Sequence, residues 1–197
     1  MPQDIFEQEA EAYDDWYVAH SKVYRIECER IRNVLPTPDG RAIEVGVGSG
    51  RFAAPLGIQI GIEPSVALGR MGRKRGIEVI RGVGESLPLK CGVCTSVLMM
   101  TTICFFDKPR LAMAEAYRVL IPGGVLVVGF LERDAPPIQA YLRGERTHRF
   151  LSQGRFLTSG EVEALLQTAG FVIRSAESMD DFCVIVAEKR DETDPVE

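Results

Sequence analysis

The chain has 197 residues, 46% hydrophobic and 26% charged, a balance typical of one folded domain rather than of a disordered chain. Its net charge of −5 offers no basic footprint for a phosphate backbone, which argues against nucleic acid as a partner. No apolar run reaches the roughly 20 residues that a membrane-spanning helix needs, so we expect no membrane insertion. The acidic start lacks the features of a secretory signal, and five scattered cysteines favour reduced thiols, so we expect a cytoplasmic protein.

Two patterns follow each other along the chain. Over the first 35 residues, apolar side chains recur at helical spacing, which predicts one or two amphipathic helices ending at Leu35. From residue 42 onward, short apolar runs alternate with helical segments. The expected strands are 42–47, 58–62, 77–80, 97–100 and 125–130, and the expected helices are 51–56, 65–75 and 109–120. Such alternation predicts a mostly parallel sheet with helices on both faces.

The regular alternation is interrupted at residues 132–155, a segment of mixed charge that we interpret as an insertion. A helix at 159–169 and two strands, at 171–175 and 182–188, complete the pattern. Because the link between these strands is too short for a parallel crossover, they are expected to pair as an antiparallel hairpin. We therefore expect one domain over residues 1–190, followed by a charged, disordered tail at 191–197.

The most informative run is Glu44-Val45-Gly46-Val47-Gly48-Ser49-Gly50, where the first strand ends. Alternate glycines allow a tight turn and let a ligand approach the backbone, although glycines also close ordinary turns. Glu63, which ends the second strand, is expected beside this turn, where a carboxylate can accept both hydroxyls of a ribose. The alternative is that Glu63 only provides a favourable charge at a helix start.

A dinucleotide-binding enzyme is the competing interpretation of this turn. Its fingerprint is Gly-x-Gly-x-x-Gly, whereas here the third glycine comes one residue early. The carboxylate of Glu44, two residues before Gly46, would repel a pyrophosphate and suit a ligand that carries an ammonium or sulfonium group. The run therefore disfavours NAD.

The same run resembles the first motif of the class I S-adenosylmethionine-dependent methyltransferases. Residues 60–65 are similar to the second motif of that family, residues 81–89 to the third, and residues 114–124 to the helix and turn before the fifth strand. The most similar branch is the UbiE-like one, often labelled type 11. The resemblance implies a Rossmann-like, doubly wound, seven-stranded sheet with an antiparallel C-terminal strand, covered by an N-terminal helical lid at residues 1–35. It also implies that residues 132–155 lie on the acceptor side.

The cofactor implied by the resemblance is S-adenosylmethionine, and its product is S-adenosylhomocysteine. The matching cofactor-binding positions are Glu44, Gly46, Gly48, Gly50, Glu63, Pro64, Gly84, Glu85, Met100 and Thr101. Glu44 would lie near the methionine amino group, the glycines would line the methionine and ribose, and Glu63 would hold the ribose hydroxyls. Residues 84–85 would lie against the adenine, and residues 100–101 would face the methyl donor. Val83 and Thr95 depart from the family, which usually has aspartate at both positions.

Methyl transfer is an in-line displacement that needs a general base only if the acceptor must lose a proton, so the sequence indicates no catalytic residue. We expect an unidentified small-molecule acceptor and no metal. The alternative is a binding protein that keeps the cofactor but not the catalysis. Candidate acceptor contacts are Tyr13, Trp16, Tyr17 and Thr102. Trp16 and Tyr17 are equally well explained as residues that pack a helix onto the sheet.

Overall fold

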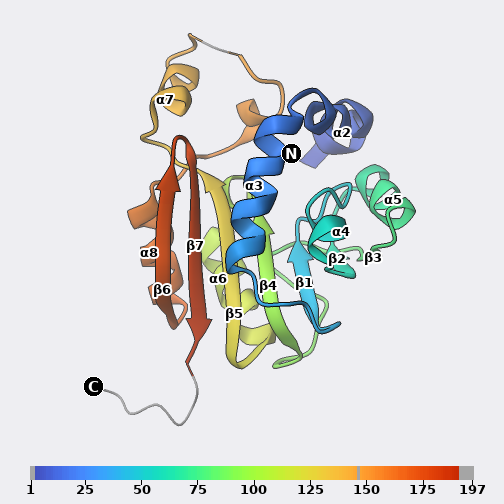
Figure 1. The fold of residues 1–197 in the computed structure, drawn as a ribbon, viewed down its shortest axis with the longest axis vertical. Coiled ribbons are helices and arrows are strands. Elements are labelled where there is room, and N and C mark those ends of the chain that lie inside the picture. The colour runs from blue at the N-terminus through green and yellow to red at the C-terminus, as the bar shows by residue number, and fades with distance from the viewer. Residues whose placement is uncertain (1–2, 146, 191–197) are drawn as a thin grey trace.

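The computed structural model describes residues 3–145 and 147–190, and the tail predicted to be disordered lies outside them. One seven-stranded sheet runs through the molecule in the order β3-β2-β1-β4-β5-β7-β6 (Figure 1). Its strands are β1 Ala42–Val45, β2 Ile60–Ile62, β3 Glu78–Ile80, β4 Cys94–Met100, β5 Leu120–Leu131, β6 Phe171–Met179 and β7 Phe182–Lys189. The first five strands pair in parallel, whereas β7 is antiparallel to both β5 and β6. The predicted sheet and C-terminal hairpin are confirmed.

Helices cover both faces of this sheet (Figure 1). They are α1 Gln3–Gln8, α2 Ala10–Ala19, α3 Ser21–Val34, α4 Ala53–Leu56, α5 Val66–Lys74, α6 Pro109–Val119, α7 Pro136–Leu142 and α8 Ser159–Thr168, with 3-10 turns η1 Ile103–Phe105 and η2 Leu151–Gln153. The helices α3 and α4 pack on one face, and α6 and α8 pack on the other. Among the described helices, none has the length and apolar character needed to span a bilayer.

Local signals in the sequence set several helix boundaries. Ser65 caps α5, because its Oγ accepts a hydrogen bond from the Leu68 N–H at 3.1 Å. Thr158 and Glu161 form a reciprocal capping box at the start of α8. Pro109 occupies the first turn of α6, where its missing N–H costs no hydrogen bond. These helices lie within a residue or two of their predicted positions.

The N-terminal region is more broken than the sequence suggested. The one or two predicted helices are three, because the backbone leaves helical geometry at Glu9 and again at His20. The strand β5 also begins earlier than predicted. Its pairing with β4 passes from Leu120 opposite Cys94 to Val125 opposite Ser96, so the residues between them, Pro122 included, bulge out of the ladder.

Two apolar cores pack against the two faces of the sheet. Val97 and Met99 of β4 contribute to the core beneath α6 and α8, and Leu98 and Met100 to the core beneath α3 and α4. All four side chains are buried. Because both faces are covered, β4 is a continuous apolar run rather than an alternating one.

Candidate active site

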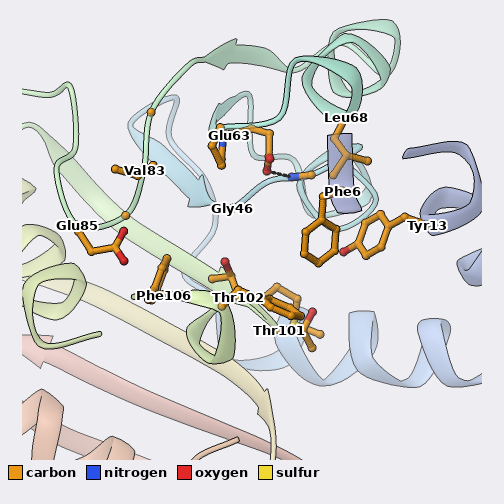
Figure 2. Close-up of a pocket in the computed structure, with 16 residues that line it drawn as sticks. Phe6, Tyr13, Gly46, Glu63, Leu68, Val83, Glu85, Thr101, Thr102 and Phe106 are labelled. Atoms are coloured by element: carbon orange, nitrogen blue, oxygen red, sulfur yellow. Dashed lines mark hydrogen bonds between the residues drawn. The ribbon is translucent and has the colours of Figure 1, made fainter. Parts of the chain in front are cut away.

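A pocket of about 670 Å³, its open mouth included, lies at the carboxyl ends of β1, β2, β3 and β4. This end of the sheet is where the strand order reverses around β1, the position where doubly wound folds bind ligands. The pocket is lined by Phe6, Tyr13, Gly46, Gly48, Glu63, Pro64, Leu68, Gly82, Val83, Gly84, Glu85, Met100, Thr101, Thr102, Phe105 and Phe106. Phe6 and Tyr13 lie on the opposite side from Val83 and Glu85 (Figure 2).

The glycine turn after β1 forms part of the pocket wall, and Gly46 within it leaves no room for a side chain. Gly46 has a φ of +72°, and a Cβ built there would lie 2.3 Å from Oγ1 of Thr102. On the far side of the pocket, a Cβ on Gly84 would lie 2.5 Å from the ring of Phe106. Because real Cβ atoms do not approach other atoms so closely, both positions require glycine if Thr102 and Phe106 keep their places.

Glu63 connects the glycine turn to the start of α5. One carboxylate oxygen accepts the Gly48 N–H at 2.8 Å, as Figure 2 shows, and the other accepts the Ser65 N–H at 2.9 Å. The side chain is only 6% exposed, and this burial raises its pKa to about 7 although the two N–H donors act in the opposite direction. Each oxygen keeps a second lone pair, so the carboxylate can accept further hydrogen bonds from a ligand.

Glu44 lies in β1 beneath the glycine turn, outside the pocket lining. It is 2% exposed, and one carboxyl oxygen has no hydrogen-bond partner among the residues described. Burial raises the pKa of Glu44 well above its ordinary value. A buried carboxyl group without a full set of partners is costly, and such groups concentrate at functional sites.

Thr101, the residue that follows β4, has a strained backbone. Its φ of +47° is rare for a β-branched residue, and its N–H donates to the carbonyl of Gly129 at 2.7 Å. Strained backbone of this kind persists where the surrounding structure fixes it, often at ligand sites. Thr101 and Thr102 both line the pocket.

Comparisons with known proteins agree with this geometry. Residues 43–128 match a family model described as a methyltransferase domain. A crystal structure of a Thermotoga maritima S-adenosylmethionine-dependent methyltransferase, described as a possible histamine N-methyltransferase, is 35% identical with a TM-score of 0.88, covering 96% of this chain and 100% of that one. An uncharacterised protein of Methanocaldococcus jannaschii is 35% identical over 85% of this chain and 81% of its own length. The chain belongs to the class I S-adenosylmethionine-dependent methyltransferases.

A further relative has a named activity. Malonyl-[acyl-carrier protein] O-methyltransferase of Geobacter sulfurreducens is 30% identical to this methyltransferase over 84% of the chain and 68% of the relative. The resemblance drawn from the sequence motifs is therefore confirmed at the level of the family, and S-adenosylmethionine is its cofactor. Among the described lining residues, the side chains that can carry a charge near neutral pH are the carboxyl groups of Glu63 and Glu85. The lining therefore suits this cofactor, because a carboxylate attracts the positive charge of a sulfonium.

The structure brings together most of the site residues predicted for this methyltransferase. The ten that line the pocket are Tyr13, Gly46, Gly48, Glu63, Pro64, Gly84, Glu85, Met100, Thr101 and Thr102. Four others lie outside the lining. Glu44 lies in the strand below, and a Cβ on Gly50 would lie 3.3 Å from the backbone of Gly72 in α5, so Gly50 allows that helix to approach the turn closely.

The other two are aromatic residues of α2. Tyr17 is buried, and its hydroxyl lies 2.8 Å from that of Tyr13. Trp16 stacks on His20, with ring centroids 4.4 Å apart. Tyr17 belongs to the core on the face of the sheet covered by α3 and α4, and Trp16 packs against that core, which fits the alternative that these residues pack the helix onto the sheet.

Several lining residues were not predicted. Phe105 and Phe106 follow β4 closely, and extending the strand-end rule by a few residues beyond Thr102 would have found them. Phe6 comes from α1 and Leu68 from the first turn of α5, and no local pattern distinguishes either from a core residue. Their place in the pocket depends on tertiary packing.

The N-terminal helices and the insertion between β5 and α8 meet at the pocket in an aromatic cluster. The ring of Phe6 lies 5.3 Å from Tyr13, 5.0 Å from Phe105 and 5.6 Å from Phe150, and Tyr13 lies 5.3 Å from Phe150. Phe150 belongs to the insertion at residues 132–155. The N-terminal helices and this insertion therefore form one apolar wall over the strand ends.

Proposed function

We propose that this methyltransferase acts on a small amine with an apolar body, and that the acceptor lies against Phe6, Tyr13 and Phe105, the members of the aromatic cluster that line the pocket. The observation that carries the proposal is the charge of the pocket. Among the described lining residues there is no lysine, arginine or histidine, whereas Glu63 and Glu85 provide two carboxylates. A carboxylate or phosphate acceptor would enter this environment without a cationic partner, which is costly in a partly desolvated site.

The descriptions of two relatives point to different acceptor chemistries, a possible histamine N-methyltransferase from Thermotoga maritima and a malonyl-[acyl-carrier protein] O-methyltransferase from Geobacter sulfurreducens. The pocket charge favours the first for this chain. An amine acceptor also requires no general base in the transfer step itself. A neutral amine attacks with its lone pair, so no proton has to leave during the transfer step.

Each part of the pocket has a role in this proposal. The cofactor, when bound, supplies a methyl group activated by a sulfonium. Gly46 and Gly48 of the glycine turn would provide close backbone contact, Glu63 would accept the ribose hydroxyls, and Gly84 and Glu85 would lie against the base. Phe6 and Tyr13 would exclude water from the reacting atoms and fix the acceptor, which supplies much of the catalysis in such displacements.

Calorimetric titration tests the cofactor site. S-adenosylmethionine and S-adenosylhomocysteine are expected to bind the wild-type protein, and Glu63→Gln should weaken both by about tenfold to a hundredfold, because a charge-assisted acceptor is lost. The matched control is Glu78→Gln, which makes the same change at an exposed position of β3. Equal affinity in wild type and Glu63→Gln would contradict the role of Glu63.

Methyl transfer tests the acceptor class. The purified protein is incubated with cofactor labelled in its methyl group and with matched panels of small primary or secondary amines and small carboxylic acids of similar apolar bodies. We expect labelled product with amines. Product with the acids and none with the amines would contradict the proposed acceptor class while leaving the cofactor site intact.

A further inference from the structure

A buried carboxylate, Asp14 of α2, joins the N-terminal helices to the glycine turn. Its side chain is 8% exposed. One oxygen accepts Nε of Arg51 at 2.9 Å, and the other accepts Nη2 of Arg51 at 2.6 Å and Nη2 of Arg75 at 2.7 Å. This is a bidentate pair with a second guanidinium added, an arrangement far more specific in geometry than a surface ion pair.

Both arginines hold the glycine turn. Arg51 directly follows Gly50 in the chain, and Nη1 of Arg75 donates to the carbonyl of Ser49 at 2.7 Å. The preceding residue of α2, Tyr13, reaches the same turn through the pocket, because a Cβ built on Gly48 would lie 3.5 Å from the Tyr13 ring. One helix therefore contacts the turn through two adjacent side chains, a tyrosine in the pocket and an aspartate bound to the arginines.

Two more acidic side chains dock the same segment. The carboxylate of Glu7 in α1 accepts Oγ of Ser65 at 2.7 Å and the N–H of Ala67 at 3.1 Å, at the start of α5. Ser65 in turn donates its N–H to Glu63. Glu9 lies 2.5 Å from Arg149 of the insertion. The acidic start of the sequence thus contacts the arginines beside the glycine turn, the start of α5 and the insertion.

The side chain of Asp14 is ionised at neutral pH because its arginine partners lower its pKa. Burial alone would raise its pKa, but the hydrogen bonds from Arg51 and Arg75 outweigh that effect and lower the pKa to about 2. The carboxylate is therefore ionised throughout the neutral range. Removing its charge would leave two partly buried guanidinium groups without this partner, which favours separation of α2 from the turn.

We propose that Asp14 is a positioning residue that makes cofactor affinity depend on the docking of α1 and α2, because the arginines it holds fix the shape of the glycine turn. The inference rests on the proposed cofactor site. In a protein whose binding-competent state is only fractionally populated, the apparent dissociation constant rises in inverse proportion to that fraction. Undocking of the N-terminal helices therefore weakens cofactor binding even though Asp14 itself lies outside the pocket lining.

The test uses full-length protein and the single tryptophan of the chain, Trp16, which lies in α2 and so reports on its docking. In Asp14→Asn, we expect the dissociation constant of S-adenosylmethionine to rise at least tenfold. Acrylamide should quench Trp16 fluorescence more strongly than in wild type, and saturating cofactor should restore the protection. Asp15→Asn, a change of the same kind at an exposed neighbour on the same helix, should behave as wild type in both measurements.

Two further variants guard against a general loss of structure. Glu7→Gln removes the second contact and should weaken cofactor binding several-fold with an unchanged circular dichroism spectrum. Arg75→Met, alone and combined with Asp14→Asn, completes a double-mutant cycle, and the two losses in affinity should be clearly less than additive. Independent effects of the two substitutions would instead give additive losses in affinity.

The outcomes separate the inference from the proposed function. Unchanged affinity in Asp14→Asn overturns the coupling, and so does weaker affinity with unchanged quenching of Trp16, since the helices would then still be docked. Failure of wild type itself to bind S-adenosylmethionine would instead contradict the cofactor site. Wild-type binding that Glu63→Gln weakens and Asp14→Asn leaves unchanged would keep the site and reject only the role of Asp14.

Discussion

At the scale of single residues, close approaches of side chains to glycine backbone shape the pocket. Gly46 and Thr102, which follow different strands, lie so close that any side chain at position 46 would overlap Thr102. Gly84 lies equally close to Phe106. Glycine is therefore required in the glycine turn for two reasons, the packing of neighbouring side chains against the backbone and the approach of a ligand.

Gly46→Ala is expected to destabilise the fold and abolish cofactor binding. A left-handed backbone costs an alanine about 1–2 kcal/mol, and the overlap with Thr102 adds to that cost. Gly92→Ala separates the two effects, because Gly92 also has a positive φ, +62°, but has open space around it. Denaturant unfolding should show a clearly larger loss for Gly46→Ala than for Gly92→Ala. Equal losses in the free energy of unfolding would mean that the Thr102 side chain can move away from position 46 without destabilising the fold.

Cofactor affinity should depend on pH through Glu63. Its pKa, raised by burial to about 7, means that the carboxylate gains a proton as the pH falls through neutrality. Protonation removes an acceptor that the ribose hydroxyls need, so the dissociation constant should rise below about pH 7, by up to about tenfold per pH unit. Calorimetry from pH 5.5 to 8 measures this dependence. Glu63→Gln should lose it, and a wild-type affinity that stays constant over that range would be inconsistent with a raised pKa.

At the scale of elements, the sequence predicted most of what the periodicity of buried side chains determines. The strands, the helices between them and the C-terminal hairpin all follow from apolar patterns and from link lengths. The division of the N-terminal region into three helices could not be predicted, because the residues at the two breaks, Glu9 and His20, are neither glycine nor proline. The early start of β5 was missed because Pro122, Gly123 and Gly124 are typical of a turn. In the structure these residues only bulge from the pairing of β5 with β4.

The same limit applies to the candidate site. Residues at strand ends, such as Glu63 and Thr101, could be predicted because a parallel sheet brings its carboxyl ends together. Phe6 could not, since its contribution depends on how α1 folds back over the sheet. Asp14 shows the limit most clearly. Nothing in the sequence distinguishes it from Asp15, yet one is buried between two arginines and the other is exposed.

Glu27 of α3 provides a stability prediction for an element outside the site. It is 7% exposed, and burial first, then the charge of Asp181, raises its pKa to about 7 in spite of Arg30. A carboxyl group with a raised folded pKa favours the folded state below its unfolded pKa, and this contribution is lost as the pH rises toward 7. Glu27→Gln should therefore raise the free energy of unfolding by about 1–3 kcal/mol at pH 8 and have little effect near pH 5.

The control for Glu27 is Glu29→Gln, the same change at an exposed position of the same helix. Denaturant unfolding of both variants at pH 5 and pH 8 measures the effect. A stabilisation by Glu27→Gln that is equal at the two pH values would show that Glu27 does not change protonation between them.

At the scale of the whole molecule, the sheet separates two cores, and the pocket lies at one end of it, where the N-terminal helices and the insertion meet. Tyr17 belongs to the core beneath α3 and α4, and its hydroxyl contacts Tyr13 in the pocket wall. The N-terminal segment is thus part of a core and part of the site at once. Ligand binding and global stability should be linked through it.

Thermal unfolding tests this linkage. At a cofactor concentration of 100 times the dissociation constant, binding stabilises the folded state by about 2.7 kcal/mol, which corresponds to a rise in Tm of about 5–10 °C for a chain of this size. If α2 unfolds together with the sheet, Trp16 fluorescence and far-ultraviolet circular dichroism should give the same Tm, with and without cofactor. In Asp14→Asn the fluorescence transition should come first, because α2 then separates from the glycine turn before the sheet melts. A lower Tm by fluorescence than by circular dichroism in the wild-type protein would mean that the N-terminal helices open independently of the sheet. Cofactor would then raise the Tm measured by fluorescence more than the Tm measured by circular dichroism.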